Sequence, residues 1–487
     1  MANEPRTGLC RVFRPGIHLQ EGPEPGTYVL PEWHDRYMAW QDELDQRGPS
    51  RDPKLQAVVH KLIEDIRRGG AKAAWRAARK FDAPELKFSQ FEVSEDELWD
   101  AEVEPEHAGA IQHSIERVRA FHQHQLQAVT QGWTAGSDAE GAPLWRWTTP
   151  ARPYELDTGY EGQLMRPLQS VGLYIPGGQA DYASSVIMTA VPAIVAGVDR
   201  LVMCCPPRKD GTLSPAVLFA ARSVGVETIY KVGGASAVAF MALAAFDHPA
   251  YRMRGYAPGA DKVVGPGNKY VNEAKRQLWG AVGLDAYAGP SEVAVVVDET
   301  ADARAAAVDW LTQVEHAEDN EGYLFSTSEA KLDEVLREAE RLLDGAPRAF
   351  VMRRALKERG VALFGNRNIV LRYVNLVAPE HLTLMVADPE WWIGRVANAG
   401  CILVGEHTPQ SAGDFCSGPS HTLPTAGAAR FGSPLSVLDF LKVQSLSRLT
   451  HSDLTALRPT IEAFGDLEGF PMHGMGATVR FEDHGAV

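Results

Sequence analysis

From Val171 onward, short apolar runs alternate with helical segments at a regular pace. The runs VGLYIPGG, RLVMCCPP, TIYKVGG and KVVGPGN have the length of buried strands, and each ends at glycine, proline or asparagine. A segment with helical character follows each run, such as SSVIMTAVPAIVAGV after the first. This alternation is typical of a doubly wound parallel sheet.

A second series of the same kind begins near Glu292. The run EVAVVVD reads as a buried strand, residues 301–317 as its helix, and GYLFSTS as the next strand. The runs VALFG, NIVLRYVNLVAP and CILVGE continue the pattern of the second sheet. The fold class is therefore predicted to be α/β, with two doubly wound, Rossmann-like sheets.

With 487 residues the chain is too long for one ordinary core. We expect an N-terminal arm over 1–52 and a first α/β domain built from 53–125 plus 292–432. Residues 126–291 would form a second, nucleotide-binding α/β domain with a leading loop, and 433–487 a C-terminal dimerisation arm.

Finer features are expected within these segments. A helix from Pro53 should stop at Gly69-Gly70, and a second should follow over 71–80. Ser94 should cap a short helix, and a long helix should follow Pro105. Residues 130–160 read as a loop or hairpin, and ATVRFE near the end as a strand.

Composition excludes several classes of protein. The formal net charge of −15 argues against a nucleic acid or an anionic membrane as partner. No run of about 18 apolar residues is present, so no membrane span is predicted. The five cysteines lack C-x-x-C spacing and the first residues lack a signal-peptide core, which predicts a cytoplasmic protein.

The segment DFCSGPSHTLPT carries chemistry on a rigid stretch of chain. It places the Asp414 carboxylate seven residues before the His421 imidazole. The intervening Gly418 and Pro419 disfavour a regular helix or strand. We therefore expect an irregular loop whose polar groups bind a metal or a substrate.

Three further pairs have suitable chemistry. Gln313 and His316 are three residues apart on a predicted helix, so both would project from one face toward one metal. Glu380 precedes His381, an imidazole suited to proton transfer near neutral pH. Glu468 lies five residues before His473 in a part of the chain without an evident core role. Each pair alone is a weak signal.

Glycine turns lie at the ends of the predicted strands. Gly177-Gly178, Gly233-Gly234 and the run GPGN from Gly265 to Asn268 follow three of them. Doubly wound sheets bind ligands at this edge, where helix N-termini face phosphates. No G-x-G-x-x-G follows the first strand, so a nucleotide site and ordinary turns both remain open.

Together these segments resemble the histidinol dehydrogenase family. The resemblance extends from about Pro53 to Arg480. Its motifs VGLYIPGG, VGPGNKYVNEAKRQ, AGPSEV, QVEH, APEHL, AGDFCSGPSHTLPT and a closing E-x-x-x-x-H occur in the family's order.

The resemblance implies a zinc- and NAD-dependent enzyme of amino-acid biosynthesis that oxidises L-histidinol through its aldehyde to L-histidine. By motif, Glu380 and His381 would be catalytic, and zinc would be held by Gln313, His316, Asp414 and His473. The substrate would contact these four together with Ser291, His381, His421 and Glu468, and the cofactor Tyr174, Ser236 and Asn268.

The same resemblance implies a homodimer that exchanges its C-terminal arms, with no nucleic acid or membrane partner. Glu468 and His473 would then serve the other subunit's site, which takes a small-molecule substrate. Ser236 departs from the family, which usually has glutamine there, and the stretch between Phe121 and Val171 is longer than usual. Paralogues with the same zinc set oxidise other small alcohols such as sulfopropanediol, which is the alternative function.

Overall fold

The structure is a computed structural model of the 487-residue chain. It describes residues 9–13, 20–21, 28–29, 40, 42–44, 47, 52–138, 141–151, 158–177, 181–247, 253, 257–286 and 289–482. Much of the predicted arm over 1–52, and Gly178 of the first glycine turn, lie outside these residues. The chain divides into unit 1, Met1–Gln125 with Gln169–Phe440, and unit 2, Leu126–Leu168 with Leu441–Val487.

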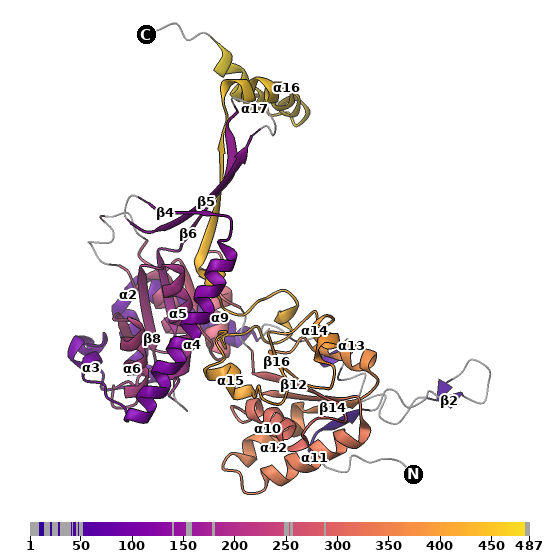
Figure 1. The fold of residues 1–487 in the computed structure, drawn as a ribbon. Coiled ribbons are helices and arrows are strands. Elements are labelled where there is room, and N and C mark those ends of the chain that lie inside the picture. The colour runs from indigo at the N-terminus through magenta and orange to yellow at the C-terminus, as the bar shows by residue number, and fades with distance from the viewer. Residues whose placement is uncertain are drawn as a thin grey trace. The chain divides into compact units, whose positions relative to one another are not determined.

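Unit 1 contains a five-stranded parallel sheet in the order β11-β10-β7-β8-β9 (Figure 1). Its strands are β7 (Ser170–Tyr174), β8 (Arg200–Cys205), β9 (Ile229–Lys231), β10 (Lys262–Val264) and β11 (Gly283–Leu284). The helices between them are α5 (Ala183–Ala196), α6 (Pro215–Val224), α7 (Gly234–Leu243) and α9 (Lys269–Leu278). The four apolar runs predicted as strands are confirmed.

Helix α2 (Pro53–Phe81) packs against this sheet's helices α7 and α9. The predicted interruption appears as a kink at Gly70, whose φ of 50° is left-handed. Leu55, Val59 and Ile63 share a core with residues of the five-stranded sheet. The predicted division grouped 53–125 with 292–432, and here the structure differs, because an apolar helical face does not indicate which of two sheets it will cover.

A six-stranded parallel sheet, ordered β1-β14-β13-β12-β15-β16, forms the rest of unit 1. Its strands are β1 (Arg11–Phe13), β12 (Glu292–Val297), β13 (Glu321–Ser326), β14 (Val361–Phe364), β15 (His381–Met385) and β16 (Cys401–Val404). Without the edge strand β1, both sheets have the Rossmann strand order, third-second-first-fourth-fifth. The predicted pair of Rossmann-like sheets is confirmed. The run NIVLRYVNLVAP, expected to continue the second sheet, instead forms a helix over Arg367–Val377, because its buried residues Val370, Val374 and Val377 recur at helical spacing.

Helices cover both faces of the six-stranded sheet. One core includes residues of α10 (Ala303–Val314), α11 (Glu329–Leu343) and α12 (Ala349–Arg359), and the other includes residues of α13 (Arg367–Val377). Figure 1 shows α10, α11 and α12 together on one side of the strands. The remaining elements of unit 1 are β2 (Gln20–Glu21), β3 (Tyr28–Val29), α3 (Glu95–Trp99), α4 (Pro105–Val129), α14 (Pro389–Ile393) and α15 (Gln410–Phe415), with short 3₁₀ turns at Phe88–Gln90, Ala428–Arg430 and Val437–Phe440. As predicted, the Ser94 side chain caps α3.

Unit 2 has an antiparallel sheet in the order β17-β6-β5-β4. Its strands are β4 (Thr134–Ser137), β5 (Pro143–Pro150), β6 (Tyr160–Pro167) and β17 (Leu441–Arg448), so the hairpin alternative for 130–160 is confirmed. Helices α16 (His451–Leu467) and α17 (Pro471–Thr478) follow β17. A carboxylate, Asp453, ties α16 to the start of β6 by accepting hydrogen bonds from Thr158 and from the amide of Gly159.

The predicted terminal strand ATVRFE is wrong. Helix α17 continues to Thr478 and a 3₁₀ turn follows at Val479–Phe481. The segment packs with α16, where Gly465 and Gly474 permit close approach of the two backbones. Tertiary packing has thus outweighed the β-branched residues that favoured a strand.

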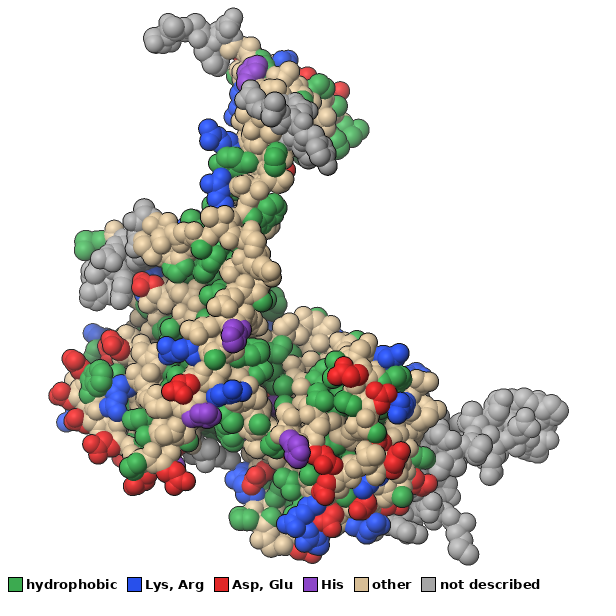
Figure 2. Space-filling view, viewed as in Figure 1, with side chains coloured by type: hydrophobic (Ala, Val, Ile, Leu, Met, Phe, Trp, Pro, Cys, Tyr) green, Lys and Arg blue, Asp and Glu red, His purple; other side chains and the backbone are tan. Residues whose placement is uncertain are grey.

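Apolar side chains remain exposed on the α16/α17 pair. Figure 2 shows such side chains gathered on one side of these helices. Phe464, Leu467, Phe470, Met472 and Met475 are each more than half exposed. An exposed apolar group of this kind is typical of a surface that contacts another protein. In the described part of the chain, no helix is both long and apolar enough to cross a membrane.

Candidate active site

Most of the predicted catalytic and metal-binding residues meet at the N-terminal edge of the six-stranded sheet. Ser291 precedes β12, and His381 is the first residue of β15. Helices α10 and α15 follow strands of this sheet, and the helices of such a unit run back antiparallel to the strands. Their last turns therefore bring Gln313 and Asp414 to the edge where the strands begin.

The Gln313 amide contacts the Asp414 carboxylate, with 3.0 Å between Nε2 and Oδ2. The two residues are separated by 101 positions in sequence. Asn320 supports them, since its side chain donates to the Gln313 carbonyl at 2.6 Å and accepts from the Ser291 amide at 3.1 Å. Two of the predicted metal ligands, Gln313 and Asp414, are thus brought together and linked to a predicted substrate contact.

Two local predictions at these ligands need correction. Asp414 lies in the short helix α15 rather than in an irregular loop, which begins after Phe415. Helix α10 ends at Val314, so His316 follows it in a turn, exposed, with its amide bonded to the Gln313 carbonyl at 3.2 Å. This backbone hydrogen bond keeps His316 in the turn directly after Gln313.

Glu380 and His381 are buried, and both contact the backbone of a single residue, Glu292. The Glu292 amide donates to Glu380 Oε2 at 2.9 Å, and the Glu292 carbonyl lies 3.3 Å from His381 Nδ1. On its other side, His381 Nε2 lies 3.4 Å from Asp414 Oδ1. The imidazole therefore spans the gap between the strand edge and the predicted metal ligand.

Burial and charge shift the pKa values of this group. Burial raises the pKa of Glu380 to about 7, although His381 and the Glu292 amide oppose the change. For His381, burial favours the neutral ring, but the Glu380 and Asp414 carboxylates outweigh it and raise the pKa. Burial likewise opposes ionisation of Asp414, yet its bond with His381 holds the pKa below its ordinary value. A carboxyl group and an imidazole that exchange protons near neutral pH suit general acid–base chemistry.

His421 is joined to the same group through the chain around it. Its Nδ1 lies 2.7 Å from the backbone carbonyl of Asp414. Burial lowers the pKa of His421, which favours the neutral ring that metals and substrates require as an acceptor. The Ser420 hydroxyl donates to the carbonyl of Met188 in α5 at 3.0 Å, so this segment also contacts the first sheet's helices.

The predicted cofactor residues lie at the C-terminal edge of the five-stranded sheet. Tyr174 ends β7, and its hydroxyl accepts a hydrogen bond from the Gly234 amide at the start of α7, 3.2 Å away. Ser236 is buried in the first turn of α7. Asn268 caps α9 by accepting from the amides of Tyr270 and Val271. The three residues thus surround two helix N-termini of the kind that bind phosphates.

The turn before Asn268 is held by a buried ion pair. Lys275 lies 2.5 Å from Asp285 and also donates to the Gly265 carbonyl at 2.6 Å. Asp285 in turn accepts from the Gly265 amide at 2.7 Å. Gly265 has a φ of 119°, and a Cβ there would lie 2.1 Å from the Tyr174 carbonyl oxygen. Only glycine fits this position.

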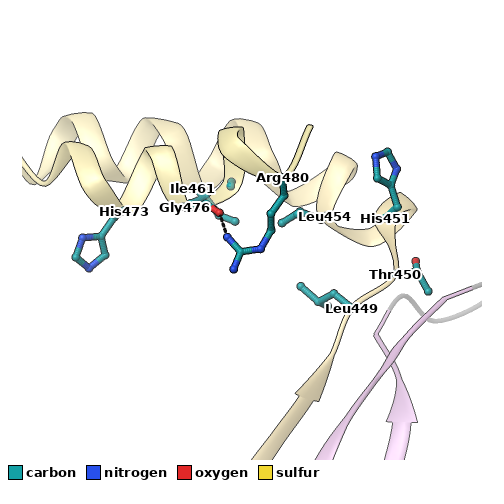
Figure 3. Close-up of a pocket in the computed structure, with 9 residues that line it drawn as sticks. Leu449, Thr450, His451, Leu454, Ile461, His473, Gly476 and Arg480 are labelled. Atoms are coloured by element: carbon teal, nitrogen blue, oxygen red, sulfur yellow. Dashed lines mark hydrogen bonds between the residues drawn. The ribbon is translucent and has the colours of Figure 1, made fainter. Parts of the chain in front are cut away.

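The remaining predicted residues, Glu468 and His473, are in unit 2 and are exposed. His473 lines a pocket of about 420 Å³ on α16 and α17. In Figure 3 its imidazole projects from α17 apart from the other labelled side chains. Its ring lies 5.3 Å from that of Phe470. Among the described residues, no three His, Cys, Asp or Glu side chains gather closely enough to hold a metal ion.

Sequence reasoning missed several residues that organise the site. Glu292 was part of the motif AGPSEV, and a charged residue opening an otherwise apolar buried strand was an available signal. Asn320 bridges two predicted residues, and Asp82 accepts a hydrogen bond from the Gly233 amide beside the predicted cofactor turn. Burial raises the pKa of Asp82 to about 6. No periodicity or spacing marks Asn320 or Asp82.

A family model described as histidinol dehydrogenase matches residues 45–481 of the chain. The chain is 37% identical over 444 residues to histidinol dehydrogenase of Heliobacterium mobile, covering 91% of this chain and 97% of that protein. It is 39% identical over 436 residues to histidinol dehydrogenase of Cereibacter sphaeroides, covering 88% and 93% of the two chains.

A solved structure gives the same result. The crystal structure of histidinol dehydrogenase from Elizabethkingia anophelis matches with a TM-score of 0.78 and 30% sequence identity. The match covers 97% of this chain and 98% of that chain, so it includes both sheets and the C-terminal helices.

Proposed function

The chain belongs to the histidinol dehydrogenase family, and we propose that it oxidises L-histidinol through L-histidinal to L-histidine with two NAD. The observation that carries this proposal is the buried Glu380–His381 pair, which lies against Asp414 at the sheet edge. A paired acid and imidazole beside a predicted metal ligand are the groups that such an oxidation needs.

We assign a zinc ion to Gln313, His316, Asp414 and His473. The donor set fits zinc, because imidazole and carboxylate are common zinc ligands and an amide oxygen adds a further donor. The contact between Gln313 and Asp414 supports the assignment, since two donors are already adjacent. When bound, zinc supplies a fixed positive charge that orients the substrate.

We further propose a homodimer in which Glu468 and His473 of each subunit complete the other subunit's site. The exposed apolar side chains of α16 and α17 support this. Five large apolar side chains gathered on one helix pair are typical of a surface that another protein covers. The assignment of His473 supports it as well, since unit 1 provides only three of the four proposed ligands. The substrate is then enclosed by residues of both subunits.

We place NAD at the C-terminal edge of the five-stranded sheet, against Tyr174, Ser236 and Asn268. The Rossmann strand order fits a dinucleotide, and so do the N-termini of α7 and α9, each of which follows a glycine-containing turn. When bound, NAD accepts the hydride in each of the two oxidations. Ser236 is shorter than the family's usual glutamine, so this part of the site offers the cofactor fewer polar atoms.

Substrate placement follows from the residues around the catalytic pair. Ser291, His421 and the partner-supplied Glu468 hold the polar groups of histidinol in this proposal. The hydrogen bond between the Ser291 amide and Asn320, and that between His421 and the Asp414 carbonyl, limit movement of these contacts. Such preorganisation keeps the carbinol carbon in one place for both oxidations.

His381 and Glu380 move the protons. In the first oxidation, His381 Nε2 removes the proton of the alcohol as hydride leaves its carbon. In the second, Glu380, assisted by His381, removes a proton from the water that adds to the aldehyde. The pKa of Glu380 near 7 allows this carboxylate to accept a proton under physiological conditions.

All five cysteines of the chain are free thiols, which is typical of proteins in the reducing cytoplasm, and we place the enzyme there.

The test is a stoichiometric assay of the purified, zinc-loaded protein. We expect two NADH for each L-histidinol consumed and L-histidine as the product. Absence of turnover with histidinol, combined with turnover of a sulfonated polyol such as sulfopropanediol, would replace this function with that of a paralogue. One NADH for each histidinol would exclude the second oxidation.

A further inference from the structure

The backbone of Glu292 contacts both proposed catalytic side chains, through the two peptide groups that flank its Cα. Its amide donates to Glu380 at 2.9 Å, and its carbonyl faces His381 at 3.3 Å. Because a carbonyl can only accept, this contact requires a proton on His381 Nδ1 and leaves Nε2 directed at Asp414. A small shift of the Glu292 backbone would disturb its contacts with both members of the pair.

The Glu292 side chain helps to fix the position of its own backbone. It is buried, with only 1% of its surface exposed. Its Oε1 lies 3.0 Å from the Arg47 guanidinium and accepts a hydrogen bond from the Ala426 amide, also at 3.0 Å. The carboxylate therefore connects the start of β12 with the segment that follows the His421 loop.

Arg47 reaches the catalytic pair by a second route. Its NH2 group donates to the carbonyl of Val377, the last residue of α13, at 2.5 Å. The turn that leads from there to Glu380 passes through Ala378, whose φ of 48° is unusual for a residue with a side chain. A guanidinium bound at a helix C-terminus stabilises this end of the helix and the turn after it.

Charge makes the connection sensitive to the loss of Arg47. Burial and the nearby Glu321 raise the pKa of Glu292, while Arg47 opposes this effect. Without the guanidinium, a buried carboxylate has to take up a proton or move toward water. Either response changes the contacts of the Glu292 carboxylate, which help to fix the position of the Glu292 backbone.

We propose that Arg47 and Glu292 are positioning residues that align Glu380 and His381 for proton transfer. They act through the Glu292 backbone and the turn after Val377, and neither touches the substrate. The proposal rests on the function proposed above. It also gives the N-terminal segment a role in catalysis, because Arg47 is 245 positions from its partner in sequence.

The experiment compares Arg47→Ala with wild type as zinc-loaded full-length enzyme. We expect kcat for histidinol to fall about 100-fold, with little change in KM or zinc content, because misplacement affects the chemical step. Guanidinium ion added to the buffer should restore part of the rate by filling the vacated position. Glu292→Gln, which keeps the acceptor for Ala426 but loses the charge, should lower kcat in the same way.

Arg11→Ala is the matched control. It removes a 2.7 Å ion pair with Glu43 in the same N-terminal segment and leaves the contacts of Glu292 unchanged. We expect its kcat to remain that of wild type. If Arg47→Ala does not fold, Arg47→Lys keeps the charge but loses the forked geometry, and should still show reduced kcat.

Hydrogen exchange at the Glu292 amide provides a readout that does not need turnover. We expect faster exchange there in Arg47→Ala than in wild type or Arg11→Ala. A wild type inactive on histidinol would refute the proposed function but leave this exchange test valid. Unchanged exchange, wild-type kcat in Arg47→Ala or Arg47→Lys, or equal losses in Arg47→Ala and Arg11→Ala would overturn the positioning role.

Discussion

His381 Nε2 lies 3.4 Å from Oδ1 of Asp414, a residue assigned to the metal. The imidazole is therefore directly beside the place where the substrate's oxygen would be held. Its other nitrogen faces the Glu292 carbonyl, which fixes the ring's orientation. The proposed base is thus in contact with Asp414, which in turn accepts a hydrogen bond from Gln313.

The two catalytic residues should affect different steps. His381→Asn should slow oxidation of histidinol by about 10²–10⁴-fold, because the alcohol loses its base. Glu380→Gln should slow oxidation of histidinal by a similar factor, while the rate of histidinol oxidation should fall less. Rapid-mixing measurements of NADH with each substrate distinguish the two effects. Equal losses in both steps for both variants would contradict the division of roles.

The rate of histidinal oxidation should depend on the ionisation of Glu380. Burial raises its pKa to about 7, so the carboxyl stays protonated below that pH and gains its base form above it. We expect kcat to rise with pH through this region and then to level off. Profiles of kcat for wild type and Glu380→Gln provide the measurement. If kcat of Glu380→Gln still rises with pH in the same region, the rise belongs to the ionisation of another group.

How much of this site could be predicted depends on how local each contact is. The pairing of Gln313 with His316 rests on a separation of three residues, which is a local signal, although α10 ends at Val314 and His316 lies in the turn after it. By contrast, the contact between Arg47 and Glu292 joins residues 245 positions apart, and nothing in either neighbourhood indicates it. Such pairs depend on how the sheets and the N-terminal segment pack together. The apolar periodicity of a sequence predicts its helices and strands but not these long-range contacts.

The location of the catalytic group also differs from what strand patterns alone suggest. The glycine turns at strand C-termini drew attention to one edge of the first sheet, near Tyr174, where we propose that NAD binds. In the second sheet, His381 begins its strand, so the proposed catalytic residues lie at the opposite, N-terminal edge. Residue chemistry gave a weak local signal for Glu380 and His381, but only the family motifs assigned them to one site, because the general rule for doubly wound sheets favours the other edge.

The turn before Asn268 should tolerate no side chain at Gly265. Gly265→Ala combines a left-handed φ with a close contact to the Tyr174 carbonyl, so we expect a loss of about 2–4 kcal/mol in the free energy of unfolding. Gly280→Ala is the control, since Gly280 has a φ of 90° but open space around it, and should cost about 1 kcal/mol. Denaturant unfolding measures both. Equal costs would show that the contact is absent.

Arm exchange can be tested by mixing two inactive variants. Asp414→Ala removes a ligand from the body of the subunit, and His473→Ala removes one from the arm. If arms are exchanged, a mixed dimer pairs one unaltered body with one unaltered arm and has a single intact site. Random reassociation makes half of the dimers mixed, so about a quarter of wild-type activity should return, with zinc in the same proportion. If each arm serves its own subunit, every site in the mixture lacks a ligand and no activity returns.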